Sequence, residues 1–194
     1  ARDLAIAILI DVSLSTDAWV EDRRVIDIEK EALLVLAHGL ATCGDDYSIQ
    51  SFTSRRRHRV WVNTLKSFDE RMCEATERRI AALKPGHYTR MGAAIRHTAL
   101  ELAKRPNRHR LLLVLSDGKP SDSDYYEGRY AIEDTRRAIM DARQQELKVF
   151  GITIDRDAHD YIAHLFGRGG YAMVHKPEHL AMALPGIYRQ IIAT

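Results

Sequence analysis

Cysteine is scarce in this sequence: Cys43 and Cys73 are the only two among 194 residues. Neither lies in a CxxC pair or in the cysteine–histidine spacing that binds structural zinc. We therefore expect packing thiols, one at a helix end and one within another helix. A chain of this length can bury a hydrophobic core without disulfides or a structural metal.

Long apolar runs are also missing. The longest, Leu4 to Ile10, covers about a third of the ~20 residues that a membrane-spanning helix needs, so we expect no membrane insertion. The sequence shows no basic, hydrophobic leader with a small-residue cleavage site. Together with the scarce cysteine, these features favour a cytoplasmic location.

An excess of one charge is absent, because 29 Lys and Arg residues face 27 Asp and Glu residues and leave a formal net charge of +2. Nucleic-acid-binding domains usually carry a strong basic excess. A local basic run at Arg55, Arg56 and Arg57 lacks the interleaved aromatic residues of a base-stacking platform. We expect no nucleic-acid partner, and the run is either a solvated turn or a contact for an acidic protein.

Several catalytic and nucleotide-binding motifs are absent. The sequence contains no GxxxxGK[ST] loop for a nucleotide, no GxSxG elbow and no HExxH pair. His159 and His164 are five residues apart, which misses the i, i+4 spacing of a helical metal site. An aspartyl-phosphate hydrolase would need a second acid two residues after Asp11, where Ser13 stands. We expect no enzymatic activity, with a metal-dependent phosphohydrolase as a minor alternative.

The sequence does contain short apolar runs that alternate with amphipathic helical stretches, which is typical of a parallel sheet covered on both faces. We expect strands at 4–10, 47–53, 59–65, 110–116, 148–154 and 171–174, and helices at 28–42, 68–83, 91–104, 131–145, 158–166 and 178–192. The gap between 53 and 59 is too short for a helical crossover, so the strand at 59–65 should be an antiparallel edge strand. The expected fold is one doubly wound, Rossmann-like α/β domain over 1–194, with a mostly parallel six-stranded sheet.

Three polar segments lie where strands of such a sheet end. Asp11, Ser13 and Ser15 directly follow or close the first strand, and Asp117 follows the strand at 110–116. Thr89 lies at the start of the helix that leads into that strand, at 91–104. Doubly wound sheets bind ligands at this carboxyl edge, so we expect the three segments to meet there.

These side chains offer only oxygen atoms, which suits Mg²⁺ best, with Mn²⁺ or Ca²⁺ as alternatives. Two carboxylates would neutralise the ion. Because Mg²⁺ retains exchangeable water positions, one position could accept a carboxylate from another molecule. Each segment alone also fits an ordinary helix cap or turn, but their joint occurrence at strand ends favours a metal site.

The D-x-S-x-S pattern beginning at Asp11, the Thr89 segment and the Asp-Gly-Lys-Pro sequence beginning at Asp117 together resemble the von Willebrand factor A domain and its metal-ion-dependent adhesion site. The resemblance covers essentially the whole chain and implies five metal ligands: Asp11, Ser13, Ser15, Thr89 and Asp117. It also implies a non-catalytic domain whose metal binds an acidic side chain of a partner. The alternative is a metal that only stiffens the sheet edge of a regulatory domain.

Residues 11–19, 52–57 and 115–135 resemble, more narrowly, the C-terminal A domains of bacterial NorD and CbbO proteins. This resemblance implies partnership with a MoxR-type AAA+ ATPase ring and the activation of a target enzyme, nitric oxide reductase or rubisco. It leaves the choice of target open. It also implies that the chain is the C-terminal part of a longer protein, because Ala1 lies only three residues before a core strand.

The loop after Asp117 carries acidic and aromatic side chains beside the expected metal site. Asp122, Asp124, Tyr125 and Tyr126 could form a recognition surface at its rim, with the two tyrosines as anchors. An ordinary solvated loop fits the same residues.

Overall fold

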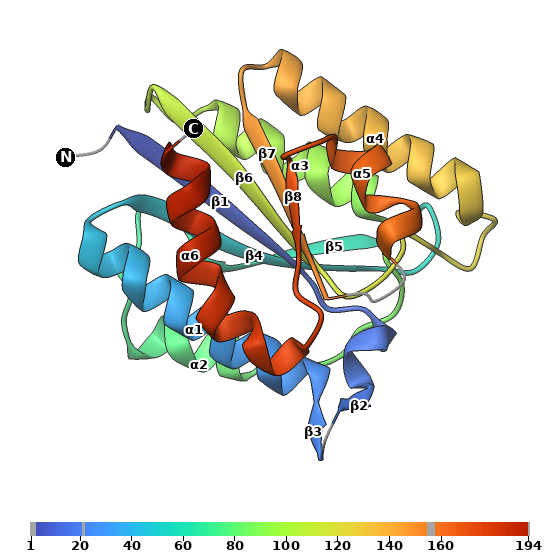
Figure 1. The fold of residues 1–194 in the computed structure, drawn as a ribbon, viewed down its shortest axis with the longest axis horizontal. Coiled ribbons are helices and arrows are strands. Elements are labelled where there is room, and N and C mark those ends of the chain that lie inside the picture. The colour runs from blue at the N-terminus through green and yellow to red at the C-terminus, as the bar shows by residue number, and fades with distance from the viewer. Residues whose placement is uncertain (1–2, 21, 155–157, 194) are drawn as a thin grey trace.

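The computed structural model describes residues 3–20, 22–154 and 158–193 and contains a six-stranded sheet in the order β5–β4–β1–β6–β7–β8 (Figure 1). Its strands are β1 (Leu4–Asp11), β4 (Asp46–Ser54), β5 (Val60–Lys66), β6 (His109–Ser116), β7 (Lys148–Thr153) and β8 (Tyr171–Met173). β4 and β5 form an antiparallel hairpin, and the other neighbouring pairs are parallel. The expected mostly parallel sheet with one antiparallel edge strand is confirmed.

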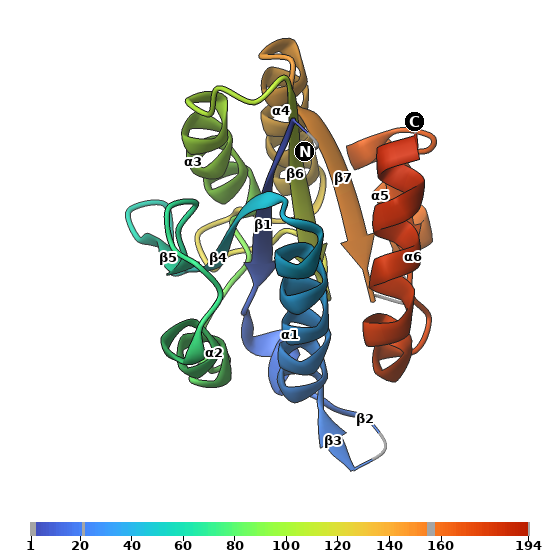
Figure 2. The ribbon, with the colours of Figure 1, turned by 90° about the vertical axis from the view of Figure 1, so that its left-hand side faces the viewer.

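Helices cover both faces of this sheet. They are α1 (Val25–Cys43), α2 (Glu74–Ala81), α3 (Met91–Ala103), α4 (Gly128–Gln144), α5 (Ile162–Phe166) and α6 (Leu180–Ala193). Figure 2 shows α1 and α6 on the opposite side of the sheet from α3 and α4. On β1, Ile6 and Ile8 pack with the α1 and α6 layer, whereas Ala7 and Leu9 pack with the α3 and α4 layer. Burial on both faces explains the continuously apolar sequence of the central strands.

The longer helices are amphipathic. In α4 the buried residues Ala131, Thr135, Ala138 and Ala142 recur at spacings of three or four, which is the helical period. α1 ends at Gly44, whose φ of 72° is the left-handed conformation that glycine favours. Within the described ranges, no helix is long and apolar enough to cross a membrane.

The predicted helix at 68–83 begins only at Glu74. The carboxylate of Glu70 accepts the backbone N–H of Ser67 at 2.9 Å, which folds this segment into a turn. Cys73 then has the extended backbone of an N-cap residue. The local side-chain contact has replaced the first helical turns that the sequence periodicity favours.

The described residues also form short elements, and two of these fall within predicted helices. The short elements are η1 (Leu14–Asp17), β2 (Trp19–Val20), β3 (Arg23–Arg24), η2 (Ala158–Asp160) and η3 (Pro177–His179). The predicted helix at 158–166 is therefore divided between η2 and α5, and the one at 178–192 starts as η3 before α6. The two-stranded β2–β3 hairpin was not predicted and lies between η1 and α1.

The expectation that the cysteines pack in the interior is wrong, because both are free and exposed. Cys43 ends α1 at a solvent-facing position, and Cys73 precedes the first turn of α2. Neither thiol therefore lies in the core.

Candidate metal centre

The residues expected to bind a metal come together at the carboxyl edge of the sheet. Asp11 is the last residue of β1, and Asp117 follows β6, which pairs with β1 in parallel. From β1 the chain continues through α1 to β4 on one side, whereas from β6 it continues through α4 to β7 on the other side. The two loops therefore diverge at the topological switch point, where open α/β sheets bind their ligands.

Hydrogen bonds join the five expected ligand residues into one cluster. Asp11 Oδ1 accepts the backbone N–H of Ser13 at 2.9 Å, and Asp11 Oδ2 accepts the hydroxyl of Thr89 at 3.1 Å. The hydroxyls of Ser13 and Ser15 lie 2.8 Å apart, and Ser15 donates to Asp117 Oδ1 at 2.6 Å. Oxygen donors from three separate segments of the sequence thus converge on one point.

Backbone pairing fixes Thr89 just before α3. Its N–H donates to the carbonyl of Ser121 at 2.8 Å, and its carbonyl accepts the N–H of Ser121 at 3.0 Å. Tyr88 pairs in the same way with Ser54 at the end of β4, with both hydrogen bonds at 2.9 Å. The Thr89 segment therefore bridges β4 and the loop that carries Asp117.

The two carboxylates of the cluster repel each other. Burial, together with the charge of Asp117, raises the pKa of Asp11 to about 7, against the lowering effect of the hydrogen bonds that Asp11 accepts. A divalent cation placed between these groups would offset the repulsion and favour the ionised form of Asp11. The donor set, two carboxylates and three hydroxyls, fits a hard cation with oxygen ligands.

Ser116 is a further member of the cluster that the sequence analysis missed. Its hydroxyl donates to Asp11 Oδ2 at 3.1 Å and accepts the backbone N–H of Gly118 at 3.3 Å. The signal in the sequence is a single polar residue at the end of an otherwise apolar strand. Ser116 therefore links the end of β6 to the carboxylate of β1.

A surface cavity of about 380 Å³ opens over the cluster. Ser13, Ser15, Thr89 and Asp117 line this cavity, whereas Asp11 lies fully buried beneath it. An ion held by these residues would therefore have one open side. In the part of the chain that the structure describes, no three His, Cys, Asp or Glu side chains gather as a metal site, so any site here depends on hydroxyl donors.

The family model for the von Willebrand factor type A domain matches residues 6–119. The chain belongs to this family. This A domain is 60% identical to Protein NorD of Brucella melitensis biotype 1 over 191 residues, which are 98% of this chain and 30% of that protein. The chain thus spans less than a third of the length of that relative.

Solved structures share the fold at low sequence identity. A von Willebrand factor type A protein from Catenulispora acidiphila has a TM-score of 0.70 and 19% identity, covering 96% of this A domain and 42% of that chain. A second structure is that of proximal thread matrix protein 1 from the mussel byssus, with a zinc-occupied metal-ion-dependent adhesion site motif. It has a TM-score of 0.67 and 14% identity, and the match covers 98% of this A domain and 48% of that chain. These likenesses show the fold of the A domain.

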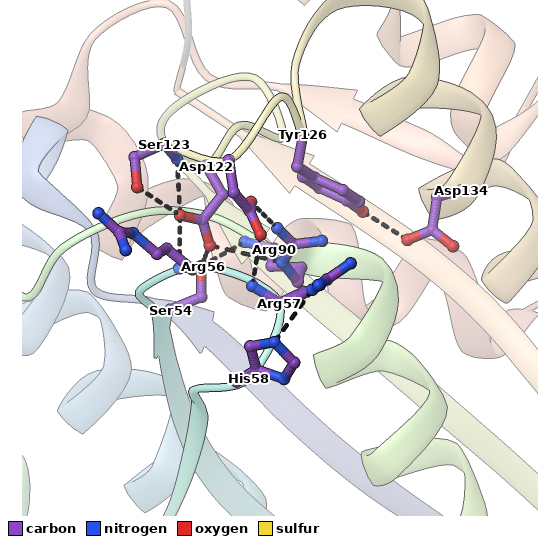
Figure 3. A network of polar contacts seen from close by, with 10 residues as sticks. Ser54, Arg56, Arg57, His58, Arg90, Asp122, Ser123, Tyr126 and Asp134 are labelled. Atoms are coloured by element: carbon purple, nitrogen blue, oxygen red, sulfur yellow. Dashed lines mark hydrogen bonds and ion pairs between the residues drawn. The ribbon is translucent and has the colours of Figure 1, made fainter.

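The expected pair of tyrosine anchors is wrong for Tyr126. Tyr126 is 1% exposed, its hydroxyl donates to Asp134 at 2.6 Å, and the Arg90 guanidinium lies 4.1 Å above its ring (Figure 3). Tyr125 is 89% exposed and has a positive φ of 65°. Only Tyr125 is accessible to a partner.

Asp122 is not accessible to a partner either, because its side chain is fully buried. Its carboxylate accepts hydrogen bonds from the Ser54 hydroxyl and the Arg56 backbone N–H, both at 2.8 Å, and lies 3.4 Å from Arg90 (Figure 3). Asp124 also pairs with Arg90. Asp122 therefore supports the loop from inside, which corrects the expectation that it belongs to a recognition surface. Asp124 keeps 22% of its side chain exposed, and its role in recognition stays a prediction.

The basic run forms the turn of the β4–β5 hairpin. Arg55, Arg56 and Arg57 have exposed side chains, while the backbone N–H of Arg57 donates to Asp124 at 2.7 Å. The backbone of the run thus anchors the turn. Its side chains are exposed, and the Arg57 guanidinium donates to His58 at 3.0 Å (Figure 3). A contact with an acidic partner remains a prediction.

Proposed function

We propose that this A domain binds a divalent cation through Asp11, Ser13, Ser15, Thr89 and Asp117, and that the ion binds an acidic side chain of a partner protein. The observation that carries this proposal is the hydrogen-bonded cluster of five oxygen donors at the floor of an open cavity. We favour Mg²⁺, with Mn²⁺ and Ca²⁺ as alternatives, because the donors are hard oxygens. The zinc-occupied motif in the mussel protein supports a divalent ion at this edge of the fold.

Because a cavity opens over the cluster, the site suits an ion that binds a partner better than a buried ion with a structural role. Asp11 lies below the cavity and would hold the ion from beneath, while the hydroxyls and Asp117 line the opening. When bound, the ion supplies a Lewis-acidic position that can take a carboxylate. Lys119 also lines the cavity and adds positive charge at its rim, which favours an acidic side chain.

We propose further that the A domain serves as a non-catalytic adaptor in a cytoplasmic activation system. Its partners would be a MoxR-type AAA+ ATPase ring, which supplies the ATP chemistry, and a target enzyme that presents an acidic residue. The similarity to NorD favours nitric oxide reductase over rubisco as that target. A structural ion in a regulatory domain is the alternative.

Calorimetric titration with Mg²⁺ and Mn²⁺ tests the metal site. We expect the wild type to bind, and Asp117→Asn to lose at least about tenfold in affinity because a charged ligand becomes neutral. Asp69→Asn is the matched control, since its carboxylate is 89% exposed and far from the cluster in sequence. Absence of binding to the wild type, or equal binding by Asp117→Asn, would overturn the metal site.

Capture of the purified ATPase and target enzyme tests docking. Wild type and Asp117→Ala are compared with and without EDTA, and we expect only the metal-loaded wild type to retain its partner. Equal recovery under all four conditions would support the structural alternative.

A further inference from the structure

Glu29 on α1 is a buried carboxylate that the proposed ligand set does not use. The residue is 1% exposed, and its Oε2 atom has no hydrogen-bond partner among the described residues. Removing a carboxylate from water is strongly unfavourable unless a cation or a hydrogen-bond donor satisfies it. The position therefore needs an explanation beyond hydrophobic packing.

The helical spacing of α1 directs Glu29 toward the sheet. Ile26 and Leu33, three residues before and four residues after, are fully buried in the core layer. α1 packs against η1, which carries Ser15, and Figures 1 and 2 both show α1 starting close to the chain segment that leaves β1. Glu29, in the second turn of α1, thus faces the core near the carboxyl edge of the sheet.

The charges of Asp11 and Asp117, the two proposed acidic ligands, affect the pKa of Glu29. Burial raises the pKa of Glu29 well above its ordinary value, and the charges of Asp117 and Asp11 raise it further. The neighbouring Lys30 pairs with Asp27, with the Nζ atom 3.7 Å from the carboxylate, on the same turn of the helix. The charges of Asp11 and Asp117 therefore reach Glu29, although these three side chains do not gather closely enough to hold an ion directly.

We propose that Glu29 lies outside the direct ligand set and accepts a hydrogen bond from water on the bound ion. The inference rests on the proposed function, because it needs a cation at Asp11 and Asp117. Such an ion would supply the positive charge and its water the donor that Oε2 lacks. Side chains in this role orient the ligands of a metal and strengthen its binding, so Glu29 is a positioning residue for the site.

Manganese titration calorimetry near neutral pH on the full chain tests this role. Glu29→Gln keeps the shape of the side chain and removes its charge, and we expect about 10- to 100-fold weaker Mn²⁺ binding. Glu31→Gln is the matched control, since it removes the same charge from the same helix at an exposed position paired with Arg23. The control should bind Mn²⁺ as the wild type does.

Thermal unfolding in EDTA gives a second readout. We expect metal-free Glu29→Gln to unfold at a higher temperature than the wild type, because the amide relieves the repulsion by Asp11 and Asp117. If Glu29 had a purely structural role, metal-free Glu29→Gln would unfold at a lower temperature than the wild type.

The outcomes separate this inference from the proposed function. If the wild type binds Mn²⁺ and Glu29→Gln binds it equally well, the role of Glu29 is overturned while the metal site stands. Lower thermal stability of metal-free Glu29→Gln would also overturn it. If the wild type binds no divalent ion, the proposed function itself fails.

Discussion

The buried carboxylate of Asp11 makes the free energy of unfolding depend on pH. In the metal-free protein, burial and the charge of Asp117 raise its pKa from 3.8 to about 7. Between these two pH values the folded state binds more protons than the unfolded state. The free energy of unfolding therefore falls as pH rises through this window, by ~4 kcal/mol at most from this group.

We predict that chelator-treated wild type is more stable at pH 5 than at pH 8. Asp11→Asn should remove most of the fall in the free energy of unfolding that Asp11 causes over this pH range. Thermal unfolding followed by circular dichroism at several pH values measures the difference between the two proteins. Asp69→Asn should keep the wild-type profile, since it removes a carboxylate whose side chain is 89% exposed. If the profiles of wild type and Asp11→Asn run parallel, the raised pKa is refuted.

The positions of the proposed ligand residues at the sheet edge could be predicted from the sequence, but the environment of single side chains could not. Asp11 and Asp117 follow apolar runs that can only be buried strands, so their place at the sheet edge follows from topology. The burial of Glu29 matches the helical period, but glutamate is rarely a buried residue type, so the sequence does not predict this position. Its proximity to Asp117 depends on tertiary packing that no local pattern encodes.

At the scale of elements, a network of charged side chains braces the metal-site loops against one another. Arg90 directly follows Thr89, and its backbone N–H donates to the Ser54 hydroxyl at 3.0 Å. Its guanidinium pairs with Asp122 and Asp124. This network connects the start of α3, the end of β4 and the loop after Asp117, so it holds the Thr89 hydroxyl in place.

We predict that Asp122→Ala destabilises the protein by ~3 kcal/mol, because it leaves the buried Arg90 guanidinium with half of its charge compensation. Urea unfolding measures this loss. The same variant should bind Mn²⁺ more weakly, since the Thr89 segment loses its support. Tyr125→Ala, at a fully accessible position of the same loop, should stay within about 0.5 kcal/mol of the wild type. Equal stability of the two variants would argue against the bracing role.

The elements that were predicted poorly are those governed by contacts distant in sequence or by local side-chain capping. β1 and β6 were predicted because fully buried strands leave a continuous apolar run. The start of α2 was missed because Glu70 binds the Ser67 backbone, which competes with the helix. The burial of Tyr126 was missed because it depends on Arg90, from another segment.

At the scale of the whole molecule, one edge of the sheet collects the features suited to docking. β4 runs parallel to β1, so the β4–β5 turn projects beyond the same edge that carries the metal cluster. The exposed side chains of Arg55, Arg56 and Arg57 therefore lie on the side of the molecule where an acidic partner would approach the ion. The small net charge of the chain conceals this local concentration of basic groups.

We predict that replacing Arg55 and Arg57 by Ser and Arg56 by Asn lowers capture of an acidic partner several-fold at low salt, since rim charges mainly accelerate association. Asn tolerates the left-handed backbone of Arg56, whose φ is 62°. The hydrogen bonds from the turn to Asp122 and Asp124 are donated by main-chain N–H groups, which the substitutions keep. Association rates of the MoxR-type ATPase measured by surface plasmon resonance across a salt series would test this.

The matched control replaces three exposed basic residues at the opposite edge of the sheet by Ser: Lys104, Arg108 and Lys148. It changes the net charge by the same amount, so a purely global charge effect would slow association equally in both triple variants. If only the changes at 55–57 slow association of the ATPase, and Mn²⁺ affinity is unchanged, the turn is identified as part of the docking surface. If the two triple variants associate at indistinguishable rates, the β4–β5 turn is a solvated hairpin turn and not part of the docking surface, because a long-range field would act on both edges alike.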